Sequence, residues 1–143
     1  MLNSGLLLLF VPLPFLSHRL VPESFLLTTI GIVVQLLFFS LAAWARRELG
    51  RNWSGAIGTF EGDQLIRSGP YRVVRHPIYT AMLGMSASTA LVSMTPHAIA
   101  GFLLIAIAYT RKVRLEESHL RAVFGEDYEV YRRKSWAIIP FLV

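Results

Sequence analysis

The segment IYTAMLGMSASTALVSMTPHAIAGFLLIAIAYT (residues 78–110) decides the fold, because it contains no Lys, Arg, Asp or Glu. At about 1.5 Å per residue, a single helix over this segment would be much longer than the roughly 30 Å hydrocarbon core of a bilayer. The polar stretch SMTPH (93–97) lies in its middle, and a proline among polar residues favours a turn. We therefore predict that Pro96 ends a helix there, which leaves two membrane segments at about 78–94 and 97–114.

Two further segments are apolar enough to be membrane helices. Residues 24–45 contain no charged residue, are followed by RRE (46–48), and are long enough for the roughly 20 residues of a spanning helix. Residues 1–16 are marginal, because Pro12 and Pro14 interrupt them, and they lack the basic start and cleavage site of a secretory signal. We predict an irregular first span in that segment.

The composition also points to the bilayer. Hydrophobic residues make up 54% of the chain and charged residues 16%, whereas soluble domains carry roughly 25% charged residues. The absence of cysteine excludes disulfides and cysteine-ligated metal, and we expect no metal site. The net charge of +5 could indicate nucleic acid, but in so hydrophobic a chain a basic collar facing anionic lipid explains it better. We expect one domain over residues 1–143, and no nucleic-acid partner.

The basic residues predict the sidedness of the chain. Of the 14 Lys and Arg residues, six lie in 46–76, seven lie in 111–134, and only Arg19 lies elsewhere. The positive-inside rule places both segments in the cytoplasm, as expected for a bacterial-type inner membrane. The predicted fold is therefore an all-α integral membrane protein with about four transmembrane helices, both termini in the cytoplasm and short interfacial C-terminal helices. A site at the cytoplasmic face would combine two segments separated by a helical hairpin.

Polar side chains that could perform chemistry flank this hairpin on both sides. On a helix, His76 and Tyr79 are three residues apart and share a face, with Pro77 tolerated in the first turn. Glu116 and Glu117 lie about 100° apart around a helix, so we expect one to face a pocket and the other either to pair with an arginine or to serve as a cap. The other polar candidates are Tyr71, Arg72, Arg75, Arg111, Lys112, Arg114, Tyr128 and Tyr131.

Each of these residues also has a purely structural interpretation. Arginines at helix ends commonly form a lipid-facing collar, and tyrosines such as Tyr79, Tyr128 and Tyr131 commonly form an interfacial belt. His76 before a proline is also typical of a helix start. The convergence of all these groups at one membrane face is what favours a site.

Three motifs make the sequence resemble a known family. LGRNWSG (49–55), LIRSGPYRVVRHPIYTAM (65–82) and RLEESHLRAVFGEDYEVYRRK (114–134), followed by IP, are similar to the isoprenylcysteine carboxyl methyltransferase family. Its wider relatives include the membrane phospholipid N-methyltransferases. The resemblance covers residues 49–140 and implies an all-helical membrane enzyme that uses S-adenosylmethionine without a soluble Rossmann domain.

The resemblance also implies roles for individual residues. Carried over by position, the cofactor-binding residues would be Asp63, Gln64, Leu65, Ile66, Tyr71, His76, Pro77, Ile78, Tyr79, Glu116 and Glu117. A basic residue implicated in substrate binding aligns with Lys112, with Arg111 adjacent, and these two are the catalytic candidates. Two positions depart from the family pattern: Asp63 stands where histidine is usual, which puts that cofactor contact in doubt, and Ala81 stands where glycine is usual.

The implied reaction is methyl transfer to a lipophilic acceptor, either embedded in the bilayer or linked to a lipid. We expect carboxyl O-methylation of an isoprenylcysteine-like substrate, with phospholipid or small-amine N-methylation as the alternative. A carboxylate is already ionised and needs a cation such as Arg111 or Lys112, whereas an amine needs a base such as a glutamate. Both residue types are present, so the acceptor stays open. Other classes to exclude are a non-catalytic membrane binding or transport protein, a sterol-reductase-like enzyme using NADPH, and a structural bundle with a lipid collar.

Overall fold

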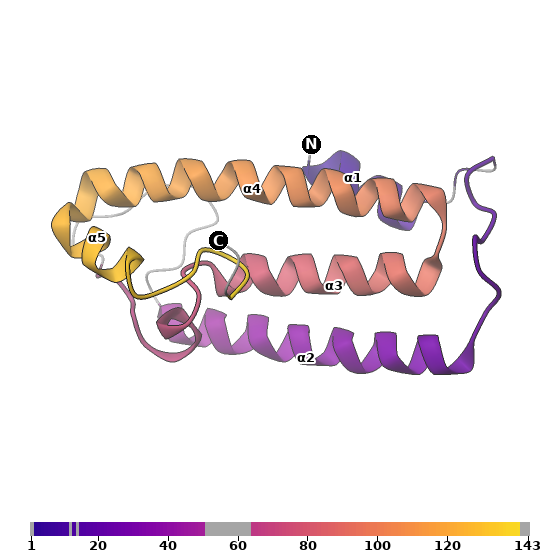
Figure 1. The fold of residues 1–143 in the computed structure, drawn as a ribbon, viewed down its shortest axis with the longest axis horizontal. Helices are drawn as coiled ribbons and strands as arrows, with labels where there is room; N and C mark the ends of the chain where they lie inside the picture. The colour runs from indigo at the N-terminus through magenta and orange to yellow at the C-terminus, as the bar shows by residue number, and fades with distance from the viewer. Residues whose placement is uncertain (1, 12, 14, 51–63, 141–143) are drawn as a thin grey trace. The chain divides into compact units, whose positions relative to one another are not determined.

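The computed structural model describes residues 2–11, 13, 15–50 and 64–140, and the fold is all-helical as predicted (Figure 1). The elements are α1 (Leu2–Phe10), α2 (Phe25–Leu49), the 3₁₀ turn η2 (Gly69–Arg72), α3 (Pro77–Ser93), α4 (Pro96–Phe124) and α5 (Glu126–Arg132). The chain divides into two compact units. The first comprises Met1–Ser40 and Ala81–Thr110, and the second comprises Leu41–Thr80 and Arg111–Val143.

The predicted break in the long apolar segment is confirmed. Helix α3 ends at Ser93 and α4 begins at Pro96, and the chain turns through Met94 at a positive φ of 46°. The side chains of Ser93 and Thr95 hydrogen-bond across this turn at 2.9 Å. The expectation that Pro96 ends a helix was wrong: it is the first residue of α4, where the missing N–H would have no helical partner and the fixed φ suits a helix.

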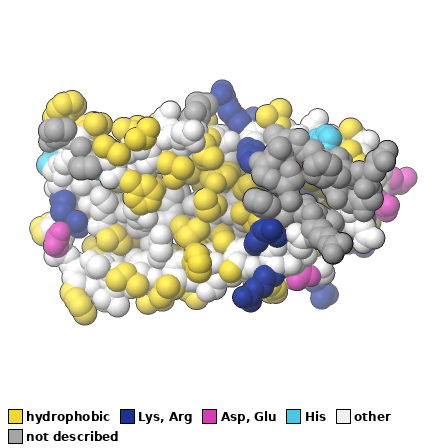
Figure 2. All heavy atoms as spheres, turned by 180° about the vertical axis from the view of Figure 1, so that it is seen from behind, with side chains coloured by type: hydrophobic (Ala, Val, Ile, Leu, Met, Phe, Trp, Pro, Cys, Tyr) yellow, Lys and Arg dark blue, Asp and Glu magenta, His cyan; other side chains and the backbone are white. Residues whose placement is uncertain are grey.

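Helix α2 has the composition of a membrane helix. It is 25 residues long, its most apolar window has a mean hydropathy of 2.2, and only 6% of that window is buried. Large apolar side chains such as Phe25, Leu37 and Phe39 are exposed, and hydrophobic side chains spread over much of the face drawn in Figure 2. Among the described residues, α2 is the one helix that meets both the length and the composition of a span. The predicted set of four spans stays a prediction.

Helix α1 is shorter than the predicted first span over residues 1–16. Its nine residues rise only about 14 Å, less than half of a bilayer core. In the first unit it packs closely against α4: a Cβ added at Gly101 would lie 2.6 Å from the backbone N of Leu9 and 2.8 Å from the O of Gly5. Glycine at position 101 therefore permits backbone-to-backbone contact between the two helices.

A stripe of small residues on α3, formed by Ala81, Gly84 and Ser88, packs against α2 within the first unit. Ala81 is fully buried, and a Cβ added at Gly84 would lie 2.3 Å from the ring of Phe38. The hydroxyl of Ser88 donates to the carbonyl oxygen of Gly31 at 2.9 Å. The stripe therefore allows close approach of the two helices, as expected for apolar helices that pack through small residues.

In the second unit, the C-terminal segment runs beside the entry to α3. Arg75 N donates to Trp136 O at 2.7 Å and His76 N donates to Ala137 O at 3.0 Å. The Thr80 hydroxyl donates to Ile138 O at 2.6 Å. These bonds fix the backbone on both sides of His76. The segment SGP (68–70) forms a turn that leads into η2, with Gly69 at a φ of 54° that favours glycine.

Candidate functional site

The imidazole of His76 lies between two carboxylates. Its Nδ1 is 3.6 Å from Glu116 Oε2, and its Nε2 is 3.5 Å from Glu117 Oε1. His76 is only 6% exposed, immediately before the first residue of α3. The two glutamates come from α4, which continues to Phe124, well beyond the predicted end at residue 114. The structure thus brings together the R-H-P-x-Y and E-E motifs within the second unit.

Tyr79 and Lys112 extend this group. The rings of His76 and Tyr79 are stacked, with centroids 5.5 Å apart and planes within 4° of parallel, so the predicted shared face is confirmed. Lys112 Nζ lies 5.3 Å from the centroid of the Tyr79 ring, within the range of a cation–π contact. The Tyr79 ring is therefore in contact with His76, just before α3, and with Lys112 of α4.

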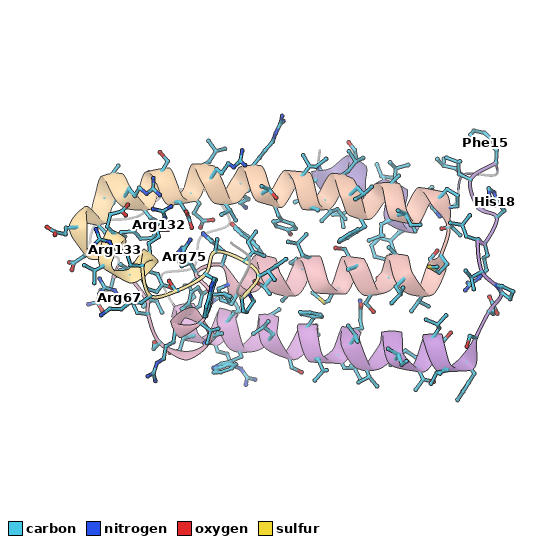
Figure 3. All side chains as sticks on the ribbon, viewed as in Figure 1. Phe15, His18, Arg67, Arg75, Arg132 and Arg133 are labelled. Carbon is cyan, nitrogen blue, oxygen red and sulfur yellow. The ribbon has the colours of Figure 1, made fainter. Side chains whose placement is uncertain are left out.

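Arg75 holds Glu117 in place through a network of hydrogen bonds. Its Nε donates to Glu117 Oε1 at 2.8 Å, and its Nη1 donates to the carbonyl oxygens of Arg132 and Ser135. The side chains of Arg75 and Glu117 are only 7% and 13% exposed. Arg75 lies beside the C-terminal segment in Figure 3. The lipid-collar interpretation is therefore wrong for Arg75, and Glu117 is the glutamate that pairs with arginine.

This environment keeps Glu117 ionised. Burial raises the pKa of the Glu117 carboxyl, but the interactions with His76 and Arg75 outweigh that effect and lower the pKa from 4.5 to about 2. Arg132 adds a weaker contact at 3.9 Å from the other carboxylate oxygen. A carboxyl group with so low a pKa holds a fixed negative charge at neutral pH and is a poor proton acceptor.

Tyr128 and Tyr131 of α5 are buried, so the interpretation as an interfacial belt is wrong for both. Tyr128 is completely buried and Tyr131 is 7% exposed, with their rings packed edge to face at 6.2 Å. The Tyr131 hydroxyl donates to Tyr71 O at 2.7 Å. Burial raises the pKa of Tyr131 to about 12 and also raises the pKa of Tyr71, so both phenols are neutral. Their spacing of three residues was the only sequence signal for this packing.

Three buried polar atoms lack a hydrogen-bond partner among the described residues: His76 Nε2, Glu116 Oε2 and Tyr128 Oη. Two of them belong to the cluster around His76. Buried polar groups are nearly always hydrogen-bonded in folded proteins, so atoms in this state are candidates to contact a ligand.

The remaining predicted site residues lie around this cluster. Pro77 is fully buried and Ile78 is half-buried, while Arg111 is exposed. In the predicted stretch 63–66, Gln64 is exposed, and Leu65 and Ile66 are half-buried. Asp63 lies outside the described residues. Their assigned roles stay predictions. The described part of the chain contains no group of three or more His, Asp or Glu side chains arranged to hold a metal ion.

One family model matches most of the chain. Residues 26–127 match the family model described as "Phospholipid methyltransferase". The chain belongs to the phospholipid methyltransferase family. The matched range includes all but the first residue of α2, all of α3 and α4, and the side chains of His76, Tyr79, Lys112, Glu116 and Glu117.

Individual proteins and a solved structure are also similar to the chain. A probable protein-S-isoprenylcysteine O-methyltransferase from Oryza sativa subsp. indica is 28% identical over 84% of this chain and 64% of its own length. The cobalt-zinc-cadmium resistance protein CzcN from Cupriavidus metallidurans is 33% identical over 82% of this chain and 50% of its own length. The solved structure of a eukaryotic intramembrane Ras methyltransferase, isoprenylcysteine carboxyl methyltransferase, superposes with a TM-score of 0.75 at 27% identity. That match covers 82% of this chain and 43% of the other, so the chain spans about half the length of the relatives it matches.

Proposed function

We propose that the chain is an S-adenosylmethionine-dependent methyltransferase that methylates the carboxylate of an isoprenylcysteine-like, lipid-linked acceptor. The observation that carries the proposal is the cluster of His76, Tyr79, Lys112, Glu116 and Glu117 in a member of the phospholipid methyltransferase family. The similarity to protein-S-isoprenylcysteine O-methyltransferases supports the choice of acceptor.

The donor set fits the proposed cofactor. S-adenosylmethionine supplies a methyl group on a cationic sulfonium, which a nucleophile displaces directly without a covalent enzyme intermediate. Glu116 Oε2, buried and without a hydrogen-bond partner among the described residues, can accept from a ribose hydroxyl or an amino group, and His76 can donate to a carboxylate. The face of Tyr79 attracts a cation with roughly 0.5–2 kcal/mol. Orientation of the reactants is the main contribution that such residues make to a displacement.

The charges around the cluster favour a carboxylate acceptor over an amine. Lys112, in contact with the Tyr79 ring, can hold a carboxylate that is already ionised and needs no base. An amine would have to lose a proton first, and Glu117 is a poor base because its pKa is about 2. Of the two carboxylates in the cluster, Glu116 is then the one left to act as a base.

Phospholipid N-methylation is the second candidate function. It is favoured by the description of the family whose model matches residues 26–127. In this reaction Glu116 would take the proton of the amine, and Lys112 would face the lipid phosphate instead of a carboxylate. The two functions therefore differ in the role of Glu116.

We also propose that four membrane segments place the cluster at the cytoplasmic face. The basic residues of 46–76 and 111–134 and the exposed apolar side chains of α2 support this topology. The chain has no cysteine, so single substitutions Ser68→Cys and Leu20→Cys can each be labelled without background. In intact cells, a membrane-impermeant thiol reagent should label position 20 and spare position 68. Labelling of position 68 from outside would overturn the topology.

Calorimetric titration tests the proposed activity. The purified full chain should bind S-adenosylhomocysteine and not NADPH, which separates a methyltransferase from a sterol-reductase-like enzyme and from a non-catalytic protein. His76→Ala, Tyr79→Ala and Glu116→Ala should each weaken S-adenosylhomocysteine binding about tenfold or more, because each removes a cofactor contact. Arg133→Ala, which changes an exposed residue, is the control. Unchanged affinity in all three variants would refute the site.

Methyl transfer from labelled S-adenosylmethionine then identifies the acceptor. A farnesylated cysteine with a free carboxylate should be methylated, and phosphatidylethanolamine should not. The reverse result would support N-methylation, with Glu116→Gln expected to abolish it.

A further inference from the structure

A basic cavity lies in the second unit, and the residues that line it are different from those of the cluster around His76. Its volume is about 300 Å³, and it is lined by Arg67, Arg72, Val130, Tyr131 and Lys134. Three of these five residues are cations, and none is acidic. A volume of this size is at the lower end of the range for small-molecule sites, so it suits a headgroup or a small ion better than a whole lipid.

Within the part of the chain that the structure describes, the cations of this cavity have little counter-charge. No ion pair or hydrogen bond of the Arg72 or Lys134 side chain occurs among the described residues. Arg67 contacts Asp127 at 3.6 Å, but the Asp127 side chain is 81% exposed, and surface pairs of this kind contribute little. Three like charges around one cavity repel one another, and an anion held between them would remove that repulsion.

The walls of the cavity are held in place by buried contacts. Arg72 is the last residue of η2, Tyr131 lies in the last turn of α5, and Lys134 follows just beyond the end of that helix. The hydrogen bond from the buried Tyr131 hydroxyl to Tyr71 O, at 2.7 Å, ties these two segments together. Lys134 N donates to Tyr131 O at 3.0 Å, which fixes the backbone that carries the lysine. The Arg67 guanidinium lies 5.9 Å from the Tyr131 ring centroid, and Figure 3 shows Arg67 beside α5.

We propose that this cavity binds a phosphate group, either that of an anionic phospholipid headgroup or a soluble phosphate. Guanidinium and ammonium groups are the strongest side-chain donors to phosphate oxygens, and the arginine fork suits them geometrically. Basic pockets at the cytoplasmic side of membrane proteins bind anionic headgroups in the same way. The site goes beyond the proposed methyl transfer and does not depend on it.

Binding to the purified full chain in a neutral detergent tests the proposal. The probes are short-chain phosphatidylglycerol, glycerol 3-phosphate, inorganic phosphate and, as the zwitterionic comparison, short-chain phosphatidylcholine. The wild type should bind at least one of the first three more tightly than phosphatidylcholine. Tight binding of phosphatidylglycerol alone identifies a lipid headgroup, and equal binding of the soluble phosphates identifies a free phosphate; either result supports the site.

Charge-matched variants assign binding to the cavity. Arg72→Gln and Lys134→Gln should each weaken binding of the preferred probe about tenfold, because each removes a charge-assisted contact. Arg133→Gln removes one positive charge from an exposed neighbour that does not line the cavity, and it should retain wild-type affinity. If Arg72→Gln does not fold, Lys134→Gln alone decides, because Lys134 is exposed beyond the end of α5.

Three results would overturn the proposal. The first is no preference of the wild type for any anionic probe. The second is an equal loss of affinity in Arg133→Gln and Lys134→Gln, which would make the residues a diffuse lipid collar. The third is a parallel loss of S-adenosylhomocysteine affinity in Lys134→Gln, which would assign the cavity to the cofactor site. Because S-adenosylhomocysteine binding is measured separately, failure of the proposed methyl transfer leaves this test intact.

Discussion

Arg75 donates a 2.8 Å hydrogen bond to Glu117, and the same oxygen of Glu117 lies 3.5 Å from His76 Nε2. Arg75 also donates to carbonyl oxygens of the C-terminal segment. One buried guanidinium thus joins α4, the entry to α3 and the C-terminal segment. Among the described residues, Arg75 is linked to the cluster around His76 through its hydrogen bond to Glu117. We therefore assign Arg75 a positioning role.

Arg75→Ala should lower the free energy of unfolding by about 3–5 kcal/mol, because it leaves the buried Glu117 carboxylate without its partner. Thermal unfolding in detergent measures the change. Arg133→Ala, at an exposed position, should stay within about 0.5 kcal/mol of the wild type. The double variant Arg75→Ala/Glu117→Gln should regain part of the lost free energy of unfolding, and a double-mutant cycle measures how much. Equal stability of Arg75→Ala and Arg133→Ala would show that the buried pair is not important for folding.

Stability should also depend on Glu117 at acidic pH. The folded-state pKa of about 2 lies below the ordinary value of 4.5, so the unfolded chain binds the proton first as the pH falls. The stabilisation is therefore complete above pH 4.5 and lost progressively between about pH 4.5 and 2. Glu117→Gln should flatten this part of the profile of unfolding free energy against pH. Profiles of equal slope would mean that Glu117 is not the group that titrates there.

The membrane hairpin could be predicted from the sequence because charge-free length and proline are local signals. The turn between Ser93 and Pro96 follows from them, although Pro96 begins a helix instead of ending one. The end of α4 could not be predicted in the same way. Beyond residue 114 the apolar pattern that defined the span is lost, but the helix continues to Phe124 because its charged residues still favour helix and pair within the second unit.

The cluster around His76 could be predicted from motif spacing, whereas the buried residues that hold the cluster in place could not. His76 and Tyr79 share a face by helical period alone. For Arg75 and Tyr128 the sequence leaves open both a role in the site and a place at the membrane surface, because arginine and tyrosine near a span are common there. Only contacts distant in sequence, such as that between Arg75 and Ser135, distinguish a buried support from a surface residue.

Substitutions at Tyr79 separate the role of its ring from the role of its hydroxyl. Tyr79→Phe keeps the stacking on His76 and the contact with Lys112, so S-adenosylhomocysteine affinity should fall by less than threefold. Tyr79→Leu removes the aromatic face and should lower the affinity about tenfold. Calorimetric titration of both variants measures the difference. A larger loss in Tyr79→Phe than in Tyr79→Leu would assign the cofactor contact to the hydroxyl.

The contact between α1 and α4 predicts the effect of adding volume at Gly101. Gly101→Val places its side chain against the backbone of α1, with the Cβ only 2.6 Å from Leu9 N, and should destabilise the protein by about 1–3 kcal/mol. Ala100→Val adds carbon atoms at the neighbouring exposed position and serves as the control. Thermal unfolding in detergent compares the two variants. Equal stability would mean that α1 does not pack on α4 in the membrane.

Lys112 and Arg111 are adjacent, but the structure gives them different surroundings. Lys112 is half-buried against the Tyr79 ring, whereas Arg111 is exposed. A lipid-linked carboxylate would arrive from the apolar run that ends at Thr110, next to both residues. We therefore expect Lys112, and not Arg111, to make the main contact with the acceptor. The alternative for either residue is a side chain that extends to lipid phosphates, which is common for cations at a helix end.

Separate kinetic titrations of acceptor and cofactor distinguish these roles. Lys112→Gln should raise the KM for the acceptor about 10- to 100-fold, because it removes one charge-assisted contact of roughly 1.5–3 kcal/mol. Its KM for S-adenosylmethionine should change much less. Arg111→Gln is the matched control, with the same change in charge one residue away, and should keep a nearly normal KM for the acceptor. If Lys112→Gln also has wild-type kinetics for the acceptor, the substrate role is wrong and Lys112 belongs to the basic collar.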